Sequence, residues 1–180
     1  MTQTNDNNKK SIFHNRTFQI ETIYLIVIII ITLVIVFDII DTGFFLGPLR
    51  FSHWMGIIGA TFIFIYTPIF YVLKRKYRSR YKLLLNIHVF GFTTAFLFIS
   101  MHFGGQIGRP LAFYPDLGGG LALYIIVALL VFTGYLHRFH PVKIKSGKYV
   151  PPHVNRAVHV SLTSGLYIIL FIHILINSLP

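Results

Sequence analysis

Four histidines lie inside long apolar segments of this chain and share one spacing. His88 and His102 are fourteen residues apart in the segment 86–105, and His159 and His173 are fourteen residues apart in the last apolar segment. Fourteen residues make just under four helical turns, so both imidazoles of a pair leave the same helix face, roughly 21 Å apart along the axis. Neutral imidazole is a good iron ligand. Two such pairs on two helices indicate the axial ligands of two stacked haems.

A histidine inside a membrane helix is costly unless its ring nitrogens find partners. A single such histidine commonly only hydrogen-bonds a neighbouring helix, so one alone would not indicate a cofactor. Two pairs with an identical spacing are harder to explain in that way, and we therefore favour haem ligation. Because two histidines fill both axial positions, such a haem would transfer electrons and would not bind oxygen through its iron.

The composition places these histidines in an integral membrane protein. Of the 180 residues, 54% are hydrophobic and 16% are aromatic. Several apolar runs exceed the roughly 18 residues that mark a membrane span. The net charge is +11, but the basic residues lie in short stretches between apolar runs, where they indicate topology and lipid contact rather than nucleic acid. The chain has no cysteine, which excludes disulfides, iron–sulfur clusters and covalently attached haem.

The apolar runs predict an all-α fold, a polytopic membrane helix bundle with about five transmembrane helices. We expect a polar cytoplasmic tail at residues 1–17 and one transmembrane haem-binding domain at residues 18–180. The first apolar run is too long for a cleaved signal peptide, so we expect it to be retained. The helices are expected at about 20–40, 53–73, 83–103, 117–136 and 154–179.

The basic residues distinguish the two sides of the membrane. The tail, residues 74–82 and residues 137–156 hold fourteen of the sixteen lysines and arginines. The two remaining connections hold one each, Arg50 and Arg109. Under the positive-inside rule, this distribution places the N-terminus of a five-span protein inside and its C-terminus outside.

With this topology the third and fifth spans run in parallel. His88 is then level with His159 near the cytoplasmic face, and these two form the inner pair. His102 is level with His173 near the other face, and these form the outer pair. Each inner histidine soon follows a basic stretch, so the registers of the two spans agree without adjustment. Two haems held one above the other would form an electron path across the membrane.

Further residues are expected to hold the two haems. Gly91, one turn beyond His88, would let a porphyrin approach the helix backbone closely. Haem propionates need cations at the membrane surfaces, although topology alone also explains the basic residues there. The candidate cations are Arg80, Lys82 and Arg156 for the inner haem and Arg109 for the outer haem.

The other histidines leave one competing arrangement open. His53 begins the second span on the outer side, and His137 ends the fourth span on the inner side. Some b-type cytochromes spread their ligands over four helices, so both could replace members of the matched four. This scheme ranks second because it leaves two matched histidines unexplained. Otherwise His53 could contact a propionate, a quinone or an external partner, and His137 and His140 are interfacial.

The paired histidines resemble those of the ferric reductase-like transmembrane domain. That superfamily includes ferric reductases, NADPH oxidases and the membrane subunit of a bacterial methionine sulfoxide reductase system. The resemblance covers roughly residues 50–180 and lies in ligand spacing and helix order. It implies that His88 and His159 hold an inner haem b, and that His102 and His173 hold an outer haem b. The spacing is also similar to that of cytochrome b in quinol-oxidising bc complexes.

The same resemblance implies an electron-transfer subunit of an oxidoreductase. No GxGxxG stretch occurs, and we expect no flavin or nicotinamide domain, so another polypeptide would deliver electrons from a reduced nucleotide. The expected donor is a quinol or a flavoprotein, with a quinone as a further cofactor. The expected acceptor is extracytoplasmic. We expect redox partner proteins on one or both faces of a prokaryotic plasma membrane.

Two hypotheses of another class remain open. In the first, the histidines line a path for metal ions or protons. A transporter would want carboxylates beside them, and no Asp or Glu lies within the last four spans except Asp116 at an edge. In the second, the chain is a passive anchor that recruits an enzyme, and alanine at all four matched histidines would leave assembly and function intact.

Overall fold

Five helices, each long and apolar enough to cross a membrane, make up most of the chain that the structure describes. The structure is a computed structural model and describes residues 16–107, 117–139 and 151–178. The predicted all-α bundle of five spans is confirmed. The helices are α1 (Arg16–Val36), α2 (Phe51–Lys76), α3 (Tyr81–Ile107), α4 (Leu117–Phe139) and α5 (Pro152–Ser178). The smaller elements are the antiparallel strands β1 (Phe45–Leu46) and β2 (Leu49–Arg50) and a 3₁₀ turn, η2 (Arg78–Arg80).

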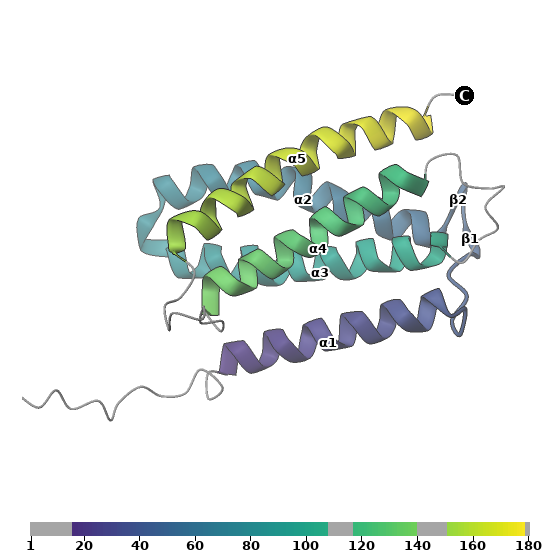
Figure 1. Cartoon of the computed structure of the whole chain (residues 1–180), viewed down its shortest axis with the longest axis horizontal. Coiled ribbons are helices and arrows are strands. Elements are labelled where there is room, and N and C mark those ends of the chain that lie inside the picture. Colours follow the sequence, from purple (N-terminus) through teal and green to yellow (C-terminus); the bar gives the residue numbers. More distant parts are fainter. Residues whose placement is uncertain (1–15, 108–116, 140–150, 179–180) are drawn as a thin grey trace, which may run out of the picture.

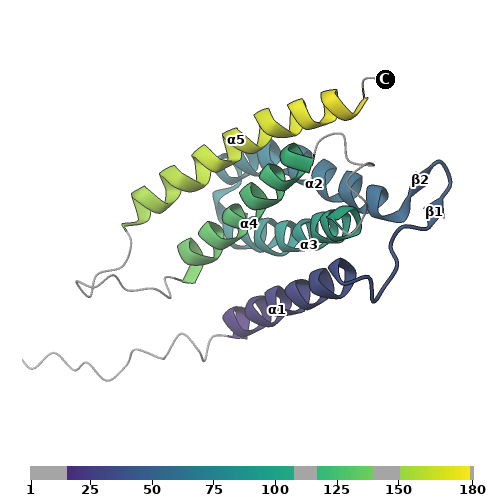
Figure 2. The same cartoon turned by 45° about the vertical axis from the view of Figure 1, so that its right-hand side comes forward.

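The helices alternate in direction, so α1, α3 and α5 run parallel to one another (Figure 1). α3 is the central helix and packs against α1, α2 and α4. α5 packs on α4 and also contacts α2, so that α3 and α5 face each other across a four-helix arrangement of α2 to α5. α1 lies outside this arrangement, and the turned view shows the same order (Figure 2).

α1 begins and ends earlier than predicted. It starts at Arg16, within the expected tail, whereas residues 1–15 of that tail lie outside the described part. The apolar run continues beyond Val36, but Asp38 adopts a left-handed φ of 56°. The amides of Asp38 and Ile39 bond back to carbonyls of the last helical turn (both 3.0 Å), which is how a left-handed residue closes a helix. Apolar composition alone does not reveal this stop.

The other helices are mostly longer than predicted because polar residues continue them. Basic residues 74–76 form the last turn of α2, where positive charge favours the C-terminal end of a helix. His137 and Arg138 play the same part at the end of α4. α5 starts two residues before the predicted position, at Pro152, since proline is well suited to a first helical position.

Pro68 lies inside α2 and helps to join this helix to α5. Proline has no N–H, so the carbonyl of Phe64, one turn earlier, has no partner within the helix. Tyr167 of α5 donates its hydroxyl to this oxygen (2.9 Å), and the two rings are 5.1 Å apart. The bond that proline removes is thus replaced by one between helices, which matters where lipid offers no partner.

The core lies at the middle of the bundle. Each helix of the four-helix arrangement contributes one residue that is 1–4% exposed, and the four belong to one cluster. We call them the mid-bundle layer: Ile63 of α2, Ala95 of α3, Val127 of α4 and Leu166 of α5. Ile28 of α1 extends the cluster from outside. The layer divides the bundle into two halves.

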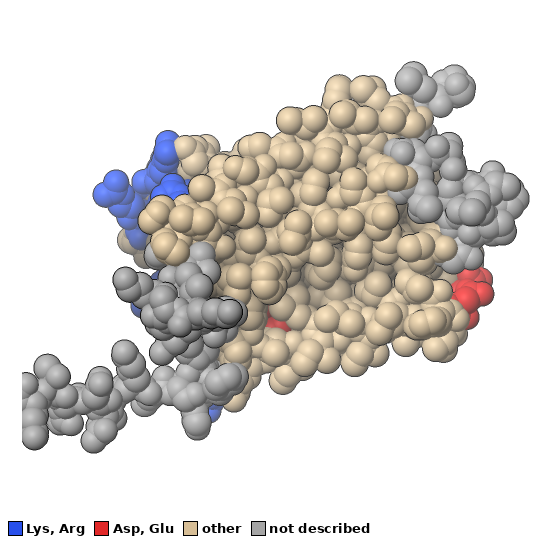
Figure 3. Space-filling model, viewed as in Figure 1, with Lys and Arg blue, Asp and Glu red and all other residues tan. Residues whose placement is uncertain are grey.

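The two ends of the bundle differ in charge. Among the described residues, every lysine and arginine except Arg50 lies at the end where α2 finishes and α3 starts, which we call the basic end. Figure 3 shows blue residues at this end, red carboxylates at the opposite end, and a further red group on the face between the two ends. The opposite end carries β1 and β2 and is called the hairpin end. Such an asymmetry is what the positive-inside rule relates to topology.

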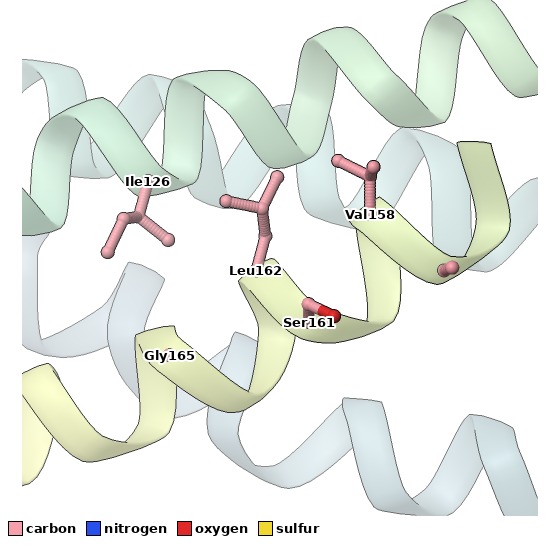
Figure 4. A pocket seen from close by; sticks show the side chains of 6 residues that line it. Ile126, Val158, Ser161, Leu162 and Gly165 are labelled. Carbon is pink, nitrogen blue, oxygen red and sulfur yellow. The ribbon is translucent and has the colours of Figure 1, made fainter. Parts of the chain in front are cut away.

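Gly59 allows α2 to approach α3 closely. A Cβ atom at this position would lie 2.8 Å from the backbone oxygen of Ala95 and 2.9 Å from Cγ1 of Ile99. Glycine is therefore required here, as is common at contacts between membrane helices. By contrast, a Cβ at Gly165 of α5 would meet nothing within 4 Å, because this residue borders an open groove (Figure 4).

We predict that Gly59→Ala lowers the free energy of unfolding by about 1–3 kcal/mol, because the added methyl group overpacks the contact with α3. Gly165→Ala is the matched control. It should leave stability unchanged or raise it by up to about 1 kcal/mol, since alanine is the better helix residue. Reversible unfolding in mixed detergent micelles, followed by circular dichroism, measures both. Equal losses in the two variants would contradict the close contact at Gly59.

Candidate functional site

The structure brings the two histidines of the inner pair together. His88 leaves α3 and His159 leaves α5, and their ring centroids are 6.4 Å apart with an interplanar angle of 67°. Both side chains are half-buried. The parallel course of the two helices explains the meeting, because each histidine lies seven residues after the first residue of its helix.

The separation of these two rings suits one metal ion between them. Bonds from an imidazole nitrogen to a metal are about 2.0–2.1 Å long. The ring centroid lies about 1.1 Å behind that nitrogen, so imidazoles on opposite sides of one metal hold their centroids roughly 6.3 Å apart. His88 and His159 therefore stand at the separation of two axial ligands.

Hydrogen bonds determine which nitrogen of His159 is available. Oγ1 of Thr133 on α4 lies 2.9 Å from Nδ1 of His159 and donates its own hydrogen to the carbonyl of Leu130 (3.1 Å). A hydroxyl has a single hydrogen, so when Thr133 donates it to Leu130, Nδ1–H of His159 is the donor in their contact. The neutral ring then carries its lone pair on Nε2, a form that can bind a metal. Asn155 donates to the backbone oxygen of Thr133 (3.0 Å) and supports this arrangement.

His102 of the outer pair is held in the same tautomer by a different partner. Its Nδ1 lies 3.0 Å from the backbone oxygen of Ser52 in the first turn of α2. A carbonyl oxygen can only accept, so Nδ1 carries the hydrogen and Nε2 carries the lone pair. Ser52 is fully buried, and its hydroxyl accepts from Gln106, one turn after His102 (3.2 Å). One histidine of each pair thus presents Nε2 as an acceptor.

His88 is packed between aromatic rings. Phe70 of α2 stacks on it with centroids 4.3 Å apart at 17°, and Phe92 lies at 4.4 Å and 43°. Nδ1 of His88 is buried, and within the described residues it has no hydrogen-bond partner. An unsatisfied buried polar atom costs about 1–3 kcal/mol. An imidazole ring that is held in place but whose hydrogen-bonding groups lack a full set of protein partners is suited to binding an added ligand.

His102 of the outer pair lies beside a third histidine. The ring of His102 is 5.5 Å from that of His53 on α2, one of the two ligands in the competing scheme. His173 lies against α4, where its Cε1 would be 3.7 Å from a Cβ at Gly120. The hairpin end therefore offers two candidate partners for His102, one on α2 and one on α5.

The remaining described histidines lie at the basic end. His137 is exposed on the last turn of α4, close enough to His159 to interact with it electrostatically. His153 is exposed in the first turn of α5. These positions agree with interfacial roles. His14 and His140 lie outside the described residues.

Two glycines of α4, Gly120 and Gly134, are also fourteen residues apart. Gly134 lies opposite His159, whose Cε1 would be 3.5 Å from an added Cβ, and Gly120 lies opposite His173. The absence of side chains on α4 at these two points leaves room beside one histidine of each pair. The glycine spacing is visible in the sequence, but its meaning depends on α4 facing α5.

The same spacing appears on α2. Phe70 stacks on His88, and Gly56, fourteen residues earlier, lies against His102. A Cβ at Gly56 would be 2.7 Å from Cγ of that ring, so only glycine fits without displacing it. Each residue of the mid-bundle layer lies midway between the two positions of its own helix. All four helices therefore share one register.

The predicted cations lie at the basic end, but another residue is nearer to the histidines. Arg80, Lys82 and Arg156 are exposed there, and Arg109 lies outside the described residues. Lys74, half-buried near the end of α2, interacts electrostatically with both histidines of the inner pair and with Arg156. The sequence offers no signal that separates Lys74 from the other basic residues around it.

Gly91 has a different neighbour from the predicted one. A Cβ at this position would collide with the ring of Phe62 on α2. Phe62 in turn contacts the rings of Tyr66 (5.3 Å) and Phe92 (5.7 Å). Gly91 thus admits an aromatic ring of α2, and the approach of a porphyrin at this point stays a prediction.

A groove between α4 and α5 is separate from the histidines. Its volume is about 420 Å³, and its lining is mostly apolar (Figure 4). Ser161 in this groove is two residues from His159 and so points to the opposite side of α5. The lining residues are Ile126, Ala157, Val158, Ser161, Leu162 and Gly165.

Within residues 16–107, 117–139 and 151–178, no group of three or more His, Cys, Asp or Glu side chains could hold a metal ion. A metal bound by protein alone usually has three or four such ligands. Haem iron needs only two axial ligands, because the porphyrin fills the other positions. The inner pair of histidines could supply two such axial ligands.

Comparison with models of protein families, with curated proteins and with solved structures gave no match. The resemblance to the ferric reductase-like transmembrane domain therefore stays a prediction. The function is inferred from the histidine geometry, the shared register and the charges described above.

We predict that nitrogen NMR of ¹⁵N-histidine-labelled protein, prepared without haem in lipid bilayers, detects His102 and His159 as Nδ1–H tautomers. In Thr133→Val, His159 should no longer be held in the Nδ1–H tautomer, because valine cannot accept a hydrogen bond. The tautomer of His102 should be unchanged. Thr163→Val is the matched control, since the Thr163 hydroxyl bonds only the backbone oxygen of His159 (2.8 Å). A His159 tautomer that survives Thr133→Val would contradict the assignment.

Proposed function

We propose that this chain is a di-haem b-type membrane cytochrome that carries electrons across the membrane. The observation that supports it most directly is the 6.4 Å separation of His88 and His159, which suits two axial imidazoles on one iron. The tautomers of His159 and His102 place a lone pair on Nε2 of one ligand in each pair. A haem held in this way supplies one-electron redox chemistry.

The chain's own residues would orient the ligands and keep the haems apart. Thr133 and the carbonyl of Ser52 accept from Nδ1–H, which fixes each ring and increases the basicity of its other nitrogen. The mid-bundle layer lies between the two pairs and excludes water from that region. His102 would share the outer haem with His173, as the equal spacing on α3 and α5 favours.

Cations at the basic end would bind the propionates of the inner haem. Lys74 and Arg156 interact with each other's charge, and Lys74 also interacts with both inner histidines. Arg80 and Lys82 are exposed nearby and would contribute less, because water screens them. Arg109 remains the candidate for the outer haem.

Electrons would pass between the basic end and the hairpin end. We place the basic end in the cytoplasm by the positive-inside rule, so that the N-terminus lies inside and the C-terminus outside. A quinol or a flavoprotein would then reduce the chain, and an extracytoplasmic redox partner would oxidise it. Transport of metal ions is less well supported, because helices α2 to α5 contain no acidic residue beside the histidines.

The cysteine-free sequence allows a direct test of orientation. We predict that Ser79→Cys at the basic end reacts with a membrane-impermeant thiol reagent only after cells are opened, whereas Phe45→Cys at the hairpin end reacts in intact cells. Both positions are exposed. The reverse pattern would overturn the proposed topology.

For the cofactor, we predict two noncovalent haems b per chain by the pyridine haemochrome assay, with low-spin spectra. His88→Ala and His159→Ala should each remove the same one haem, because each leaves its iron with a single protein ligand. His102→Ala should remove the other haem.

Comparison of His173→Ala with His53→Ala identifies the partner of His102, and we expect loss of the outer haem only in His173→Ala. His137→Ala alters an exposed histidine and is the matched control that should keep both haems. A chain that binds no haem when haem is supplied, or that keeps both haems in His88→Ala, would contradict the proposal.

A further inference from the structure

Glu21 is a buried acidic residue inside a membrane-spanning helix. It is 3% exposed and lies on the seam of α1 that also buries Ile28 and Ile35, at intervals of seven residues. Because a buried seam normally carries apolar residues, a glutamate is unexpected there. A carboxyl group inside a membrane is costly and by default indicates a functional site. The haem-binding residues proposed above leave Glu21 without a role.

Arg138, near the end of α4, is the charged neighbour of Glu21. The two groups interact electrostatically, yet Oε2 of Glu21 and Nη1 of Arg138 are both buried, and within the described part neither atom has a hydrogen-bond partner. These two atoms therefore do not bond each other. Arg138 donates from Nη2 to Asn86 (3.0 Å), which lies two residues before His88. The arginine thus connects the carboxyl group to the segment that carries the inner pair.

Side chains of α1 and α4 pack together next to Glu21 along the chain. Phe18 packs edge-on against Phe139 with centroids 5.2 Å apart and lies 5.6 Å from Tyr135, whose hydroxyl bonds Thr22 (2.7 Å). Glu21 is the single carboxyl group in this region of the described chain. The other ionisable groups in the half of α1, α3 and α4 nearest the basic end are Arg16 and Tyr24 on α1, Tyr81, Lys82 and His88 on α3, and Tyr135, His137 and Arg138 on α4.

We propose that Glu21 is a proton-binding site that takes up a proton when the haem held by the inner pair is reduced; this inference rests on the proposed di-haem function. Ile35 of α1 lies against Gly104 of α3, so Glu21, fourteen residues before Ile35, is level with about position 90 of the parallel α3, close to the depth of His88. Arg138 of α4 interacts with Glu21 and bonds Asn86 of α3, which places the carboxyl group beside the half of the bundle that holds the inner pair.

The charge balance gives the reason for the coupling. An electron on the haem that the inner pair would hold would add a negative charge to an interior that screens charge poorly. The ionised carboxyl group of Glu21 would then take one proton from water at the basic end and become a neutral carboxylic acid. Once the electron passes on towards the hairpin end, the O–H bond would break and the proton would return to water. One electron and one proton enter together, so the net charge of this half of the bundle does not change.

Redox titration of the purified full-length protein at several pH values around neutrality tests the proposal. If one proton accompanies one electron, the midpoint potential shifts by up to about 59 mV for each tenfold change in proton concentration, and it falls as pH rises. We expect this slope for the inner haem of the unaltered chain and its loss in Glu21→Gln, which is nearly isosteric but cannot ionise. Asp41→Asn, which removes an exposed carboxyl group at the hairpin end, should keep the slope.

Infrared difference spectra provide a second measurement. Reduction should produce a carboxylic acid C=O band that shifts in heavy water and is missing in Glu21→Gln. A pH-independent inner potential in the unaltered chain, or an equal slope in Glu21→Gln, would overturn the proton site while the two haems remain. A chain without haem would overturn the proposed function itself, so the two failures are distinguishable.

Discussion

The architecture of the four-helix arrangement depends on supplying partners for imidazole nitrogens away from water. Lipid offers no hydrogen bonds, so a buried nitrogen can find a protein partner only within the bundle. Ser52 satisfies Nδ1 of His102, and Thr133 satisfies Nδ1 of His159 while its own hydrogen is committed to Leu130. Each bond settles one nitrogen and leaves the other with a lone pair. Because a ligand that binds only the folded chain stabilises it, cofactor binding and folding would support each other.

The four helices share one register, which places the imidazole rings and their neighbours at two levels of the bundle. All four helices have the same rise per residue, so contacts fourteen residues apart on α3 and α5 are matched by contacts fourteen residues apart on the antiparallel α2 and α4. The mid-bundle layer marks the centre of this pattern. Ala95 is its smallest member and lies on the central helix, where Gly59 of α2 approaches the backbone. Small residues thus occur where helices come close, and larger ones fill the centre.

Helix geometry explains which features could be predicted from the sequence. The meeting of His88 with His159 follows from spacing, direction and equal depth, all of which periodicity and charge indicate. The nitrogen partners could not be predicted, because Ser52 contributes a backbone carbonyl that every residue possesses, and Thr133 resembles other threonines in apolar segments. The end of α1 depends on the left-handed conformation of Asp38, which composition does not show. The neighbour of Gly91 depends on how α2 packs, which no local pattern reveals.

α1 stands apart from the repeat, and its buried face shows that stability alone does not account for the sequence. Ile28 and Ile35 fill the seam against α3 as packing requires, whereas Glu21 places a carboxyl group on the same seam. An apolar side chain there would avoid the cost of burying an acid. A buried acid has a function if a second charge enters the same interior, because a proton bound to the acid offsets the electrostatic effect of an added electron. A helix that holds no cofactor can then still set the energy at which the neighbouring site accepts an electron.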